Sequence, residues 1–328
     1  EDNMLGEVYN QSVCIMNAAV YMYYIEKKQM HEIAEVLNIS KSTVSRLLKR
    51  ALEEDVIQFK IAPDFYESTK LERVLKERYS LEKVLVTPIL VHGDRIKPIE
   101  IKKMVALEGA RYVQRNITDE DIVGLSWGGT MYHLIQYLNP CQKAKAKVIT
   151  MHGSIANCDE KLSVETLVRR AAMAFGGKNI SICKNGLFST CEELERLKQS
   201  ENYKRMEFLF ENINISVSGV GSLYPKITTL LASTHYLKPK ELVELSDQEA
   251  HADIMLRFIK KDGTECETSM KDRTFSIDLE TYKKIPRKVI VASGAEKVYS
   301  LQAVLNGGLA DVLIIDQFLA KALVTEDY

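Results

Sequence analysis

The chain has 328 residues, a hydrophobic content of 46% and a formal net charge of −1 at pH 7. This length allows one small and one larger domain, and the near-zero charge excludes a uniformly basic nucleic-acid-binding protein, so DNA binding would need a local patch and dimerisation. No apolar run is long enough to span a bilayer and no signal peptide is visible, so we expect a cytoplasmic protein without membrane contact.

The cysteines are scattered and form no CxxC pair, which indicates reduced intracellular thiols: Cys14, Cys141, Cys158, Cys183, Cys191 and Cys266. We expect no metal site and no cofactor. Redox sensing through Cys183 and Cys191, or through Cys141 and Cys158, is a minor alternative, because no neighbouring residue clearly lowers a thiol pKa.

Residues 1–11 are polar, and Ser12–Lys28 is predicted to form a supporting helix with Ile15, Ala19, Met22 and Tyr23 on one face. Tyr21, Tyr23 and Tyr24 resemble a stacking platform for bases. At helical spacing they are more typical of core and dimer contacts.

Met30–Arg50 has the pattern of a helix-turn-helix. Ala34 is small enough for a close helix crossing, and Asn38 suits the left-handed turn that follows the first helix. Ile39 is expected to fill the junction between the helices, and Ser40 to cap the second. Packing of Val44, Leu47 and Leu48 inward then leaves a second, outward face.

The outward residues predicted to contact DNA are Lys41, Ser42, Thr43, Ser45, Arg46, Lys49 and Arg50. No acidic residue occurs between Asn38 and Arg50. Arg46 can reach guanine with two hydrogen bonds, whereas the lysines and Arg50 suit phosphates. The alternative is a helical hairpin with a solvated basic face.

Residues 56–61 alternate apolar and polar side chains, which predicts a short strand beside the recognition helix. Pro63 marks a boundary, after which residues 64–79 are predicted to form a linker helix. Its apolar stripe could pair with a second subunit or pack on its own second domain, and both remain open. We therefore expect a DNA-binding domain at 1–62, a linker helix within 63–82, and a ligand-binding and oligomerisation domain at 83–328.

From Lys83 onward, strands and helices alternate, which predicts a doubly wound, mostly parallel α/β sheet. The expected strands are 84–90, 121–125, 147–151, 180–183, 213–217, 253–258, 288–292 and 311–315. The expected helices are 98–115, 130–138, 163–175, 191–211, 227–236, 279–285, 296–305 and 317–323.

Ligands of such folds bind at the carboxyl ends of the strands. Four predicted strand ends carry small, flexible residues at 124–130, 151–154, 218–222 and 293–297. The first enters a helix, where backbone N–H groups favour an anion. The spacing thus indicates a site for a phosphorylated small molecule, with the candidate residues Trp127, Gly128, Gly129, Thr130, His152, Gly153, Ser154, Gly219, Gly221, Asp253, Gly294 and Lys297.

Several of these residues have an alternative structural role. Trp127 can cover a sugar ring or simply pack at the strand end, and Asp253 can accept hydrogen bonds from a sugar or lie on the surface. His152 is expected at the mouth of the site, whereas His133, His235 and His251 have no partner pattern.

The order of helix-turn-helix, linker and Rossmann-like domain resembles the SorC family of bacterial sugar-responsive transcriptional regulators. The most specific parts are 30–50, 123–130 and the C-terminal runs 289–297 and 305–316. This resemblance implies a ligand domain similar to sugar-phosphate isomerases and deaminases, a phosphosugar effector and a tetramer built from two dimers.

The resemblance also implies roles for particular residues. Gly128, Gly129 and Thr130 match the phosphate loop, Gly219 and Gly221 the central glycine turn, Lys297 the C-terminal lysine, and Asp253 the aspartate that contacts the sugar. The family often has arginine at the position of Gly129 and glycine at that of Ser293.

The leading hypothesis is a transcription regulator that binds a roughly palindromic operator as a homodimer or homotetramer, with a phosphosugar altering its DNA affinity. The alternative is a sugar-phosphate isomerase or deaminase carrying a DNA-binding head. That chemistry needs a positioned acid–base pair, for which Asp253, Glu296 and His152 are the loose candidates. Turnover of a panel of phosphosugars would distinguish the two.

Overall fold

The computed structural model describes residues 12–89, 96–141, 143–155, 158–181 and 185–325. The chain divides into two compact units, 1–62 and 63–328. Each is described here by itself. The predicted features at residues 1–11, 90 and 182–183 lie outside the described residues, and so does Cys183.

Unit 1 contains α2 (Val13–Val20), the π-helix η1 (Tyr21–Ile25), α3 (Met30–Leu37) and α4 (Lys41–Glu53). The helix-turn-helix prediction is confirmed. Asn38 ends α3 with a left-handed φ of 53°, and the Ser40 side chain accepts a hydrogen bond from the Thr43 N–H at the start of α4. A small core joins the helices, consisting of Met16, Ala19, Ile33, Val44, Leu47, Leu48 and Ala51, with Ile39 packed against it.

Three expectations for unit 1 need correction. The first helix changes to π geometry at Tyr21 and ends at Ile25. Thr43 does not face outward, because its hydroxyl lies 2.8 Å from the Ser40 hydroxyl and its side chain is buried. Residues 56–61 form no strand. Their alternating pattern has no partner strand among the described residues, and Phe59 and Ile61 remain exposed.

Leu47→Ala is expected to destabilise unit 1 by about 2–5 kcal/mol, because Leu47 is fully buried in a core this small. Hydrogen exchange of the amides of α3 and α4 measures this effect within the full chain. Amides of unit 2 should keep their protection, and the exposed Lys49→Ala on the same helix should change neither unit. An equal loss of protection in both units would contradict separate folding of the two.

Unit 2 is built on a parallel sheet of seven strands in the order β1-β10-β9-β5-β2-β3-β4. Their bounds are β1 (Lys83–Thr87), β2 (Ile122–Leu125), β3 (Lys147–Thr150), β4 (Lys178–Ile180), β5 (Ile215–Ser218), β9 (Arg287–Ala292) and β10 (Val312–Asp316). The predicted doubly wound α/β fold is confirmed. Because all seven strands run parallel, their carboxyl ends meet at one edge.

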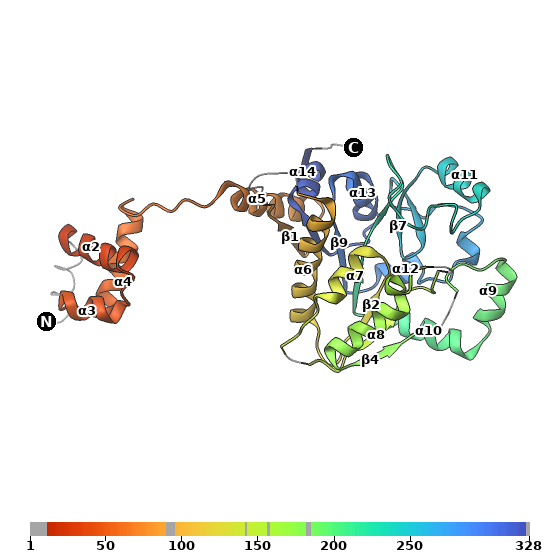
Figure 1. The fold of residues 1–328 in the computed structure, drawn as a ribbon, viewed down its shortest axis with the longest axis horizontal. Helices are drawn as coiled ribbons and strands as arrows, with labels where there is room; N and C mark the ends of the chain where they lie inside the picture. Colours follow the sequence, from red (N-terminus) through yellow and green to blue (C-terminus); the bar gives the residue numbers. More distant parts are fainter. Residues whose placement is uncertain (1–11, 90–95, 142, 156–157, 182–184, 326–328) are drawn as a thin grey trace. The chain divides into compact units, whose positions relative to one another are not determined.

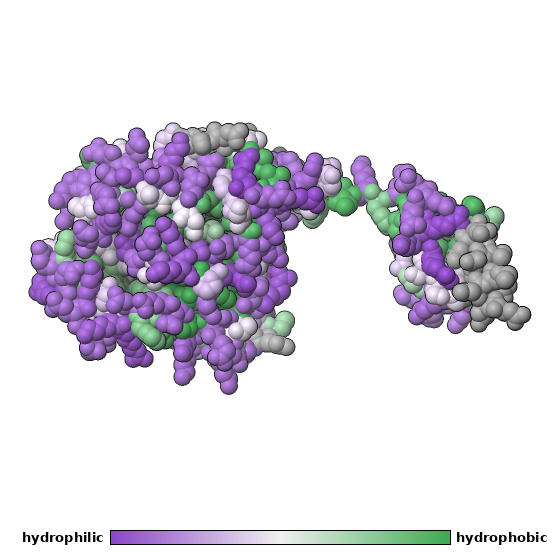
Figure 2. All heavy atoms as spheres, turned by 180° about the vertical axis from the view of Figure 1, so that it is seen from behind, coloured by the Kyte–Doolittle hydropathy of each residue, from purple (hydrophilic) through white to green (hydrophobic). Residues whose placement is uncertain are grey.

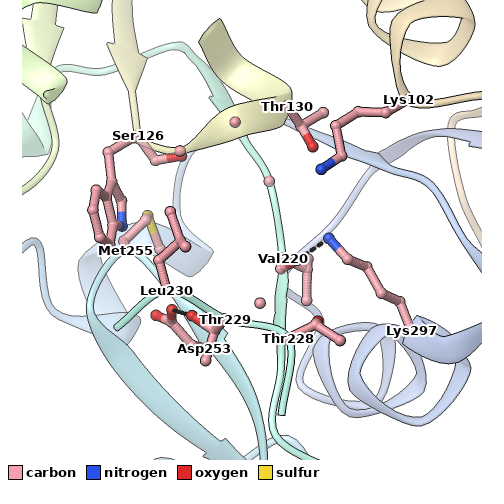
Figure 3. A pocket seen from close by; sticks show the side chains of 15 residues that line it. Lys102, Ser126, Thr130, Val220, Thr228, Thr229, Leu230, Asp253, Met255 and Lys297 are labelled. Carbon is pink, nitrogen blue, oxygen red and sulfur yellow. Dashed lines mark hydrogen bonds between the residues drawn. The ribbon is translucent and has the colours of Figure 1, made fainter. Parts of the chain in front are cut away.

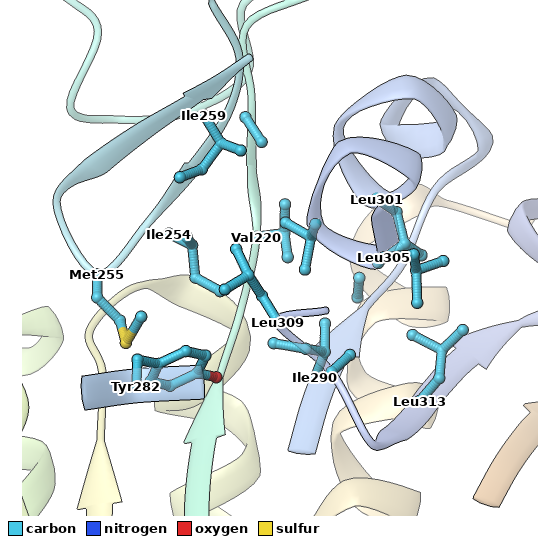
Figure 4. Close-up of a cluster of buried hydrophobic side chains, with 14 of the residues drawn as sticks. Val220, Ile254, Met255, Ile259, Tyr282, Ile290, Leu301, Leu305, Leu309 and Leu313 are labelled. Atoms are coloured by element: carbon cyan, nitrogen blue, oxygen red, sulfur yellow. The ribbon is translucent and has the colours of Figure 1, made fainter. Parts of the chain in front are cut away.

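Helices cover both faces of this sheet, and alternate strand residues point to opposite faces (Figure 1). Val289 and Val291 pack against one group of helices: α6 (Pro98–Asn116), α7 (Gly129–Gln136) and α8 (Val164–Phe175). Ile290 and Ala292 face the larger core drawn in Figure 4, which includes α5 (Pro63–Arg78), α9 (Cys191–Lys198), α10 (Glu201–Glu211), α12 (Leu279–Lys283), α13 (Val298–Asn306) and α14 (Gln317–Thr325).

A second, antiparallel sheet was not predicted. It has the order β6-β7-β8, with β6 (Gly221–Ser222), β7 (Ala250–Ile254) and β8 (Arg257–Lys260). The single strand expected at 253–258 is wrong, because the chain reverses at Met255 and Leu256, both with positive φ. Asp253 therefore lies inside β7 rather than at a strand start.

Two helix predictions also fail in this region. Residues 227–236 form no helix but an irregular segment that packs Leu231 and Ala232 into a third core, beside α11 (Pro239–Asp247), which was missed. The helix expected at 191–211 is divided into α9 and α10, because Ser200 caps α10 through the Tyr203 N–H.

Helix α5 packs on its own unit. Leu71 and Leu75 are buried in the larger core, and Glu72 accepts a hydrogen bond from the Val86 N–H of β1 at 2.9 Å. Val74, from the same predicted stripe, stays exposed. The described contacts therefore support the intramolecular role for this stripe.

The surface drawn in Figure 2 is mostly hydrophilic, with apolar side chains in small patches. Among the helices of the described ranges, none combines the length and apolarity that crossing a membrane requires.

Candidate functional site

A cavity of about 190 Å³ lies at the carboxyl edge of the sheet (Figure 3). Three of the four predicted strand ends contribute to it, those after β9, β5 and β2, which are neighbours in the sheet. The volume is below the roughly 300–1,000 Å³ typical of drug-sized ligand sites, which favours a small ligand.

Eight of the twelve predicted ligand residues line this cavity: Trp127, Gly128, Gly129, Thr130, Gly219, Gly221, Asp253 and Lys297. The structure thus brings together residues from the ends of β2 and β5, from β6 and β7, and from the 3-10 helix η4 (Ala295–Lys297) that precedes α13. The other four, His152, Gly153, Ser154 and Gly294, do not line it.

The loop after β3 turns away from the cavity. Gly153 lies against the backbone of Asn185 and Gly186, and the Ser154 carbonyl accepts a hydrogen bond from the Gly186 N–H at 2.6 Å. His152 is buried rather than at the mouth, and burial lowers its pKa to about 4. Close backbone packing explains the small residues at this strand end.

Gly294 also has a structural role. Its φ is 98°, and its N–H donates to Asp316 at 2.7 Å, which fixes the turn between β9 and the helix that carries Lys297. A side chain at Gly294 would collide with the carboxylate of Glu296.

One end of the cavity is positively charged. Gly128, with a φ of 110°, is the N-cap of α7, and the first residues of this helix line the cavity. No side chain caps this helix N-terminus and its first turn contains no acidic residue, so its N–H groups are available to an anion. Lys297 reaches the same end and donates to the Val220 carbonyl at 2.7 Å. Burial lowers the pKa of Lys297 to about 8, and repulsion from Lys102 acts in the same direction. This end can hold an anion.

The opposite end presents a buried carboxylate. Asp253 is 5% exposed, and its Oδ2 atom accepts a hydrogen bond from the Thr229 hydroxyl at 2.6 Å. Its Oδ1 atom is buried and has no hydrogen-bond partner among the described residues. Burial raises the pKa of Asp253 to about 6. An unsatisfied acceptor on a residue that lines a cavity fits a ligand hydroxyl.

Gly221 makes this arrangement possible. A Cβ atom at Gly221 would lie 2.5 Å from Thr229 and 2.9 Å from the Asp253 carboxylate, so the pair packs directly on the glycine backbone.

Trp127 lies at the cavity and is also packed at the strand end, and its contact with a sugar ring stays a prediction. It lines the cavity, and its ring makes edge contacts with His152 and Tyr236 at centroid distances of 6.5 and 6.3 Å. It therefore forms an apolar wall held in place by packing.

Sequence reasoning missed seven lining residues: Lys102, Ser126, Val220, Thr228, Thr229, Leu230 and Met255. Ser126 and Val220 adjoin predicted residues and could have been included. Thr228–Leu230 was assigned to a helix, and Lys102 lies on α6, remote in sequence from the glycine loops. No local sequence pattern indicates that Lys102 or the segment Thr228–Leu230 lines the cavity.

In unit 1, α4 exposes most of the residues predicted to contact DNA. Lys41, Ser42, Ser45, Arg46 and Lys49 are exposed. Thr43 is excluded from that surface by its burial. Arg50 is half-buried and donates to Glu54 at 2.6 Å, while Lys49 lies 3.7 Å from Glu53. The exposed basic surface is thus strongest at the first two turns of α4.

Comparisons with known proteins agree with both units. Residues 63–325 match the family described as "Putative sugar-binding domain", and residues 17–54 match the helix-turn-helix region "Sigma-70, region 4". The deoxyribonucleoside regulator of Bacillus subtilis is 30% identical over 94% of this chain and 96% of its own length. The sorbitol operon regulator of Klebsiella pneumoniae is 25% identical over 92% of this chain and 95% of its own.

The chain belongs to the SorC family of sugar-responsive transcriptional regulators. Solved structures of similar fold include the full-length sorbitol operon regulator SorC of K. pneumoniae, with a TM-score of 0.73 and 24% identity over 96% of this chain and all of that one. A Streptococcus pneumoniae transcriptional regulator gives 0.72, at 24% identity over 79% and 97% of the two chains.

The other chemistries considered for this regulator find little geometric support. Of the three acid–base candidates, only Asp253 lines the cavity, whereas His152 is buried behind Trp127 and Glu296 is exposed. Within the described ranges, no cluster of three or more His, Cys, Asp or Glu residues could hold a metal. Burial raises the pKa of the Cys158 thiol, which disfavours the reactive thiolate.

Proposed function

We propose that this SorC-family regulator controls a carbohydrate catabolic operon, and that a phosphorylated sugar in the strand-end cavity lowers its affinity for operator DNA. The observation that carries this proposal is the polarity of the cavity. Its cationic end suits a phosphate, and the unpartnered Asp253 oxygen at the other end suits a sugar hydroxyl.

The exposed face of α4 is the proposed DNA-reading surface. A homodimer would present two copies of α4 about one DNA turn apart, so the operator should be roughly palindromic; two such dimers would form a tetramer. The effector changes DNA binding only through its different affinities for the DNA-competent and DNA-released states. Loss of DNA binding on effector addition would derepress the operon.

A thermal-shift screen against phosphorylated sugars and their unphosphorylated counterparts tests the effector class. A ligand that binds only the folded chain, present at one hundred times its Kd, stabilises it by about 2.7 kcal/mol. We expect shifts from phosphorylated compounds alone. Melting-temperature shifts from free sugars only would contradict a phosphosugar effector, and so would the absence of a shift with every compound.

Phosphosugar affinity is expected to be highest between about pH 6 and 8. Above pH 8 the buried Lys297 is neutral in the free protein and must take up a proton to bind a dianion, so affinity falls by up to about tenfold per pH unit. Below pH 6 both Asp253 and the phosphate monoester gain protons, which removes the charge that each contributes.

Calorimetry in two buffers of different ionisation enthalpy measures this proton uptake directly. At pH 8.5 we expect net uptake by the wild-type chain and none by Lys297→Met. Proton uptake of the same size in both proteins would assign it to another group. The Asp253→Asn variant should keep the alkaline limb, because Lys297 is unchanged in it.

A further inference from the structure

The cavity contains a lysine that the glycine-loop pattern does not include. Lys102 lies on α6, between β1 and β2 in the chain, yet its side chain extends to the cationic end of the cavity, where its ammonium group and that of Lys297 point toward the same space (Figure 3). Its neighbour Lys103 is exposed and does not line the cavity. A lysine that served only to be solvated would be expected on the exposed surface, as Lys103 is.

The packing of α6 explains how Lys102 reaches the site. Residues seven apart lie on the same face of a helix, so Lys102 shares a face with Gly109. At Gly109 the two helices α6 and α7 approach so closely that a Cβ atom would lie 2.8 Å from Leu134 of α7. Lys102 extends this packed face toward the N-terminus of α7.

Lys102 ends beside Gly129, the first residue of α7. A Cβ atom built on Gly129 would find the Lys102 Nζ atom as its nearest neighbour, at 3.9 Å. Gly129 does not have a positive φ, so its backbone conformation does not require glycine. What marks this position is the open space beside it. Gly129 thus leaves space in front of the N-terminus of α7. The ammonium group of Lys102, from α6, lies next to this space.

The two lysines concentrate positive charge at one end of the cavity, and within the described ranges neither makes an ion pair with a carboxylate. The pKa of Lys297 is lowered by burial first and then by repulsion from Lys102. Two converging ammonium groups together with a helix N-terminus match the two negative charges of a phosphate monoester. Glu296, Asp253 and Asp316 contribute the opposing negative field at Lys297.

Building on the proposed function, we propose that Lys102 is a phosphate-binding residue of this site, delivered from α6 to the space in front of Gly129, and that it makes the cavity selective for doubly charged phosphate. Lys102 and Lys297 then hold the phosphate from two sides, and the N–H groups of α7 from a third.

The test measures thermal stabilisation of the full chain by inorganic phosphate at pH 7.5 and constant ionic strength, with chloride as the reference anion. Lys102→Met is expected to weaken phosphate binding at least tenfold, whereas Lys103→Met should leave it unchanged. Melting temperatures without phosphate verify that each variant folds. Gly129→Arg introduced into Lys102→Met should restore most of the lost affinity, because it places a cation in the same space.

Phosphate affinity that is equal in Lys102→Met and Lys103→Met would overturn the role of Lys102. The absence of any stabilisation of the wild-type chain at tens of millimolar phosphate would overturn it as well. This test is separable from the proposed function. Loss of phosphate binding in Lys102→Met would support the role of Lys102 even if no phosphosugar changed operator affinity.

Discussion

Arg46→Ala is expected to weaken specific operator binding by about 2–6 kcal/mol, or roughly 30-fold and more, because each bidentate arginine–guanine contact contributes about 1–3 kcal/mol and a dimer makes two. Arg46 is exposed on α4, and no carboxylate forms an ion pair with it in the described structure. Among the exposed residues of α4, it alone combines a guanidinium group with freedom from such a pair.

Binding to non-specific DNA separates base reading from charge. Arg46→Ala should reduce non-specific affinity only slightly and leave the salt dependence nearly unchanged. Lys41→Ala is the matched control, since losing an exposed phosphate contact in each subunit of the dimer weakens both kinds of binding and lowers the salt slope by about two. Equal losses of specific and non-specific affinity in Arg46→Ala would assign Arg46 to phosphate contact.

Lys297→Met is expected to weaken phosphosugar binding by about 1.5–3 kcal/mol, or roughly 10- to 150-fold, which is the range for a hydrogen bond to a charged group. Methionine keeps the length of the buried stem and removes the charge. The Val220 carbonyl also loses its donor, which now lies at 2.7 Å, so melting temperatures without ligand must accompany the binding data.

Fluorescence of Trp127 offers a direct titration, since it is the only tryptophan of the chain and lines the cavity. Lys226→Met is a suitable control, because Lys226 is an exposed lysine close in sequence to the cavity segment Thr228–Leu230. Unchanged affinity in Lys297→Met, with weakened binding in the control, would contradict the placement of the phosphate.

The helix-turn-helix was predictable because its signals are local. A left-handed asparagine, a serine cap and the apolar spacing of one short helix determine its turn. Thr43 was misplaced for an equally local reason. Helical spacing alone places Thr43 on the outward face of α4. In the structure, its hydroxyl contacts the capping hydroxyl of Ser40, which holds the side chain against the start of the helix.

The cavity was predictable in outline because parallel strands bring their carboxyl ends to one edge. Sequence pattern does not show which way a loop turns after its strand, so His152, Gly153 and Ser154 were wrongly predicted to line the site. Gly153 and Ser154 instead pack against residues 185 and 186, and His152 forms a bridge with Ser276. The features of the site that were not predicted depend on packing between segments far apart in the sequence. Lys102 comes from a helix face, and the reversal at Met255 and Leu256 lacks the glycine or asparagine that signals a turn.

Operator binding by the full chain, measured with and without phosphosugar, decides whether the strand-end cavity controls DNA affinity. The operator is first selected from random DNA, and its affinity is then titrated at fixed salt with a phosphosugar and with the same sugar unphosphorylated. We predict that the phosphosugar alone lowers operator affinity, by about 5- to 150-fold, and that Lys297→Met loses this response. Operator affinity that no phosphosugar changes, or that free sugar changes equally, would contradict this prediction.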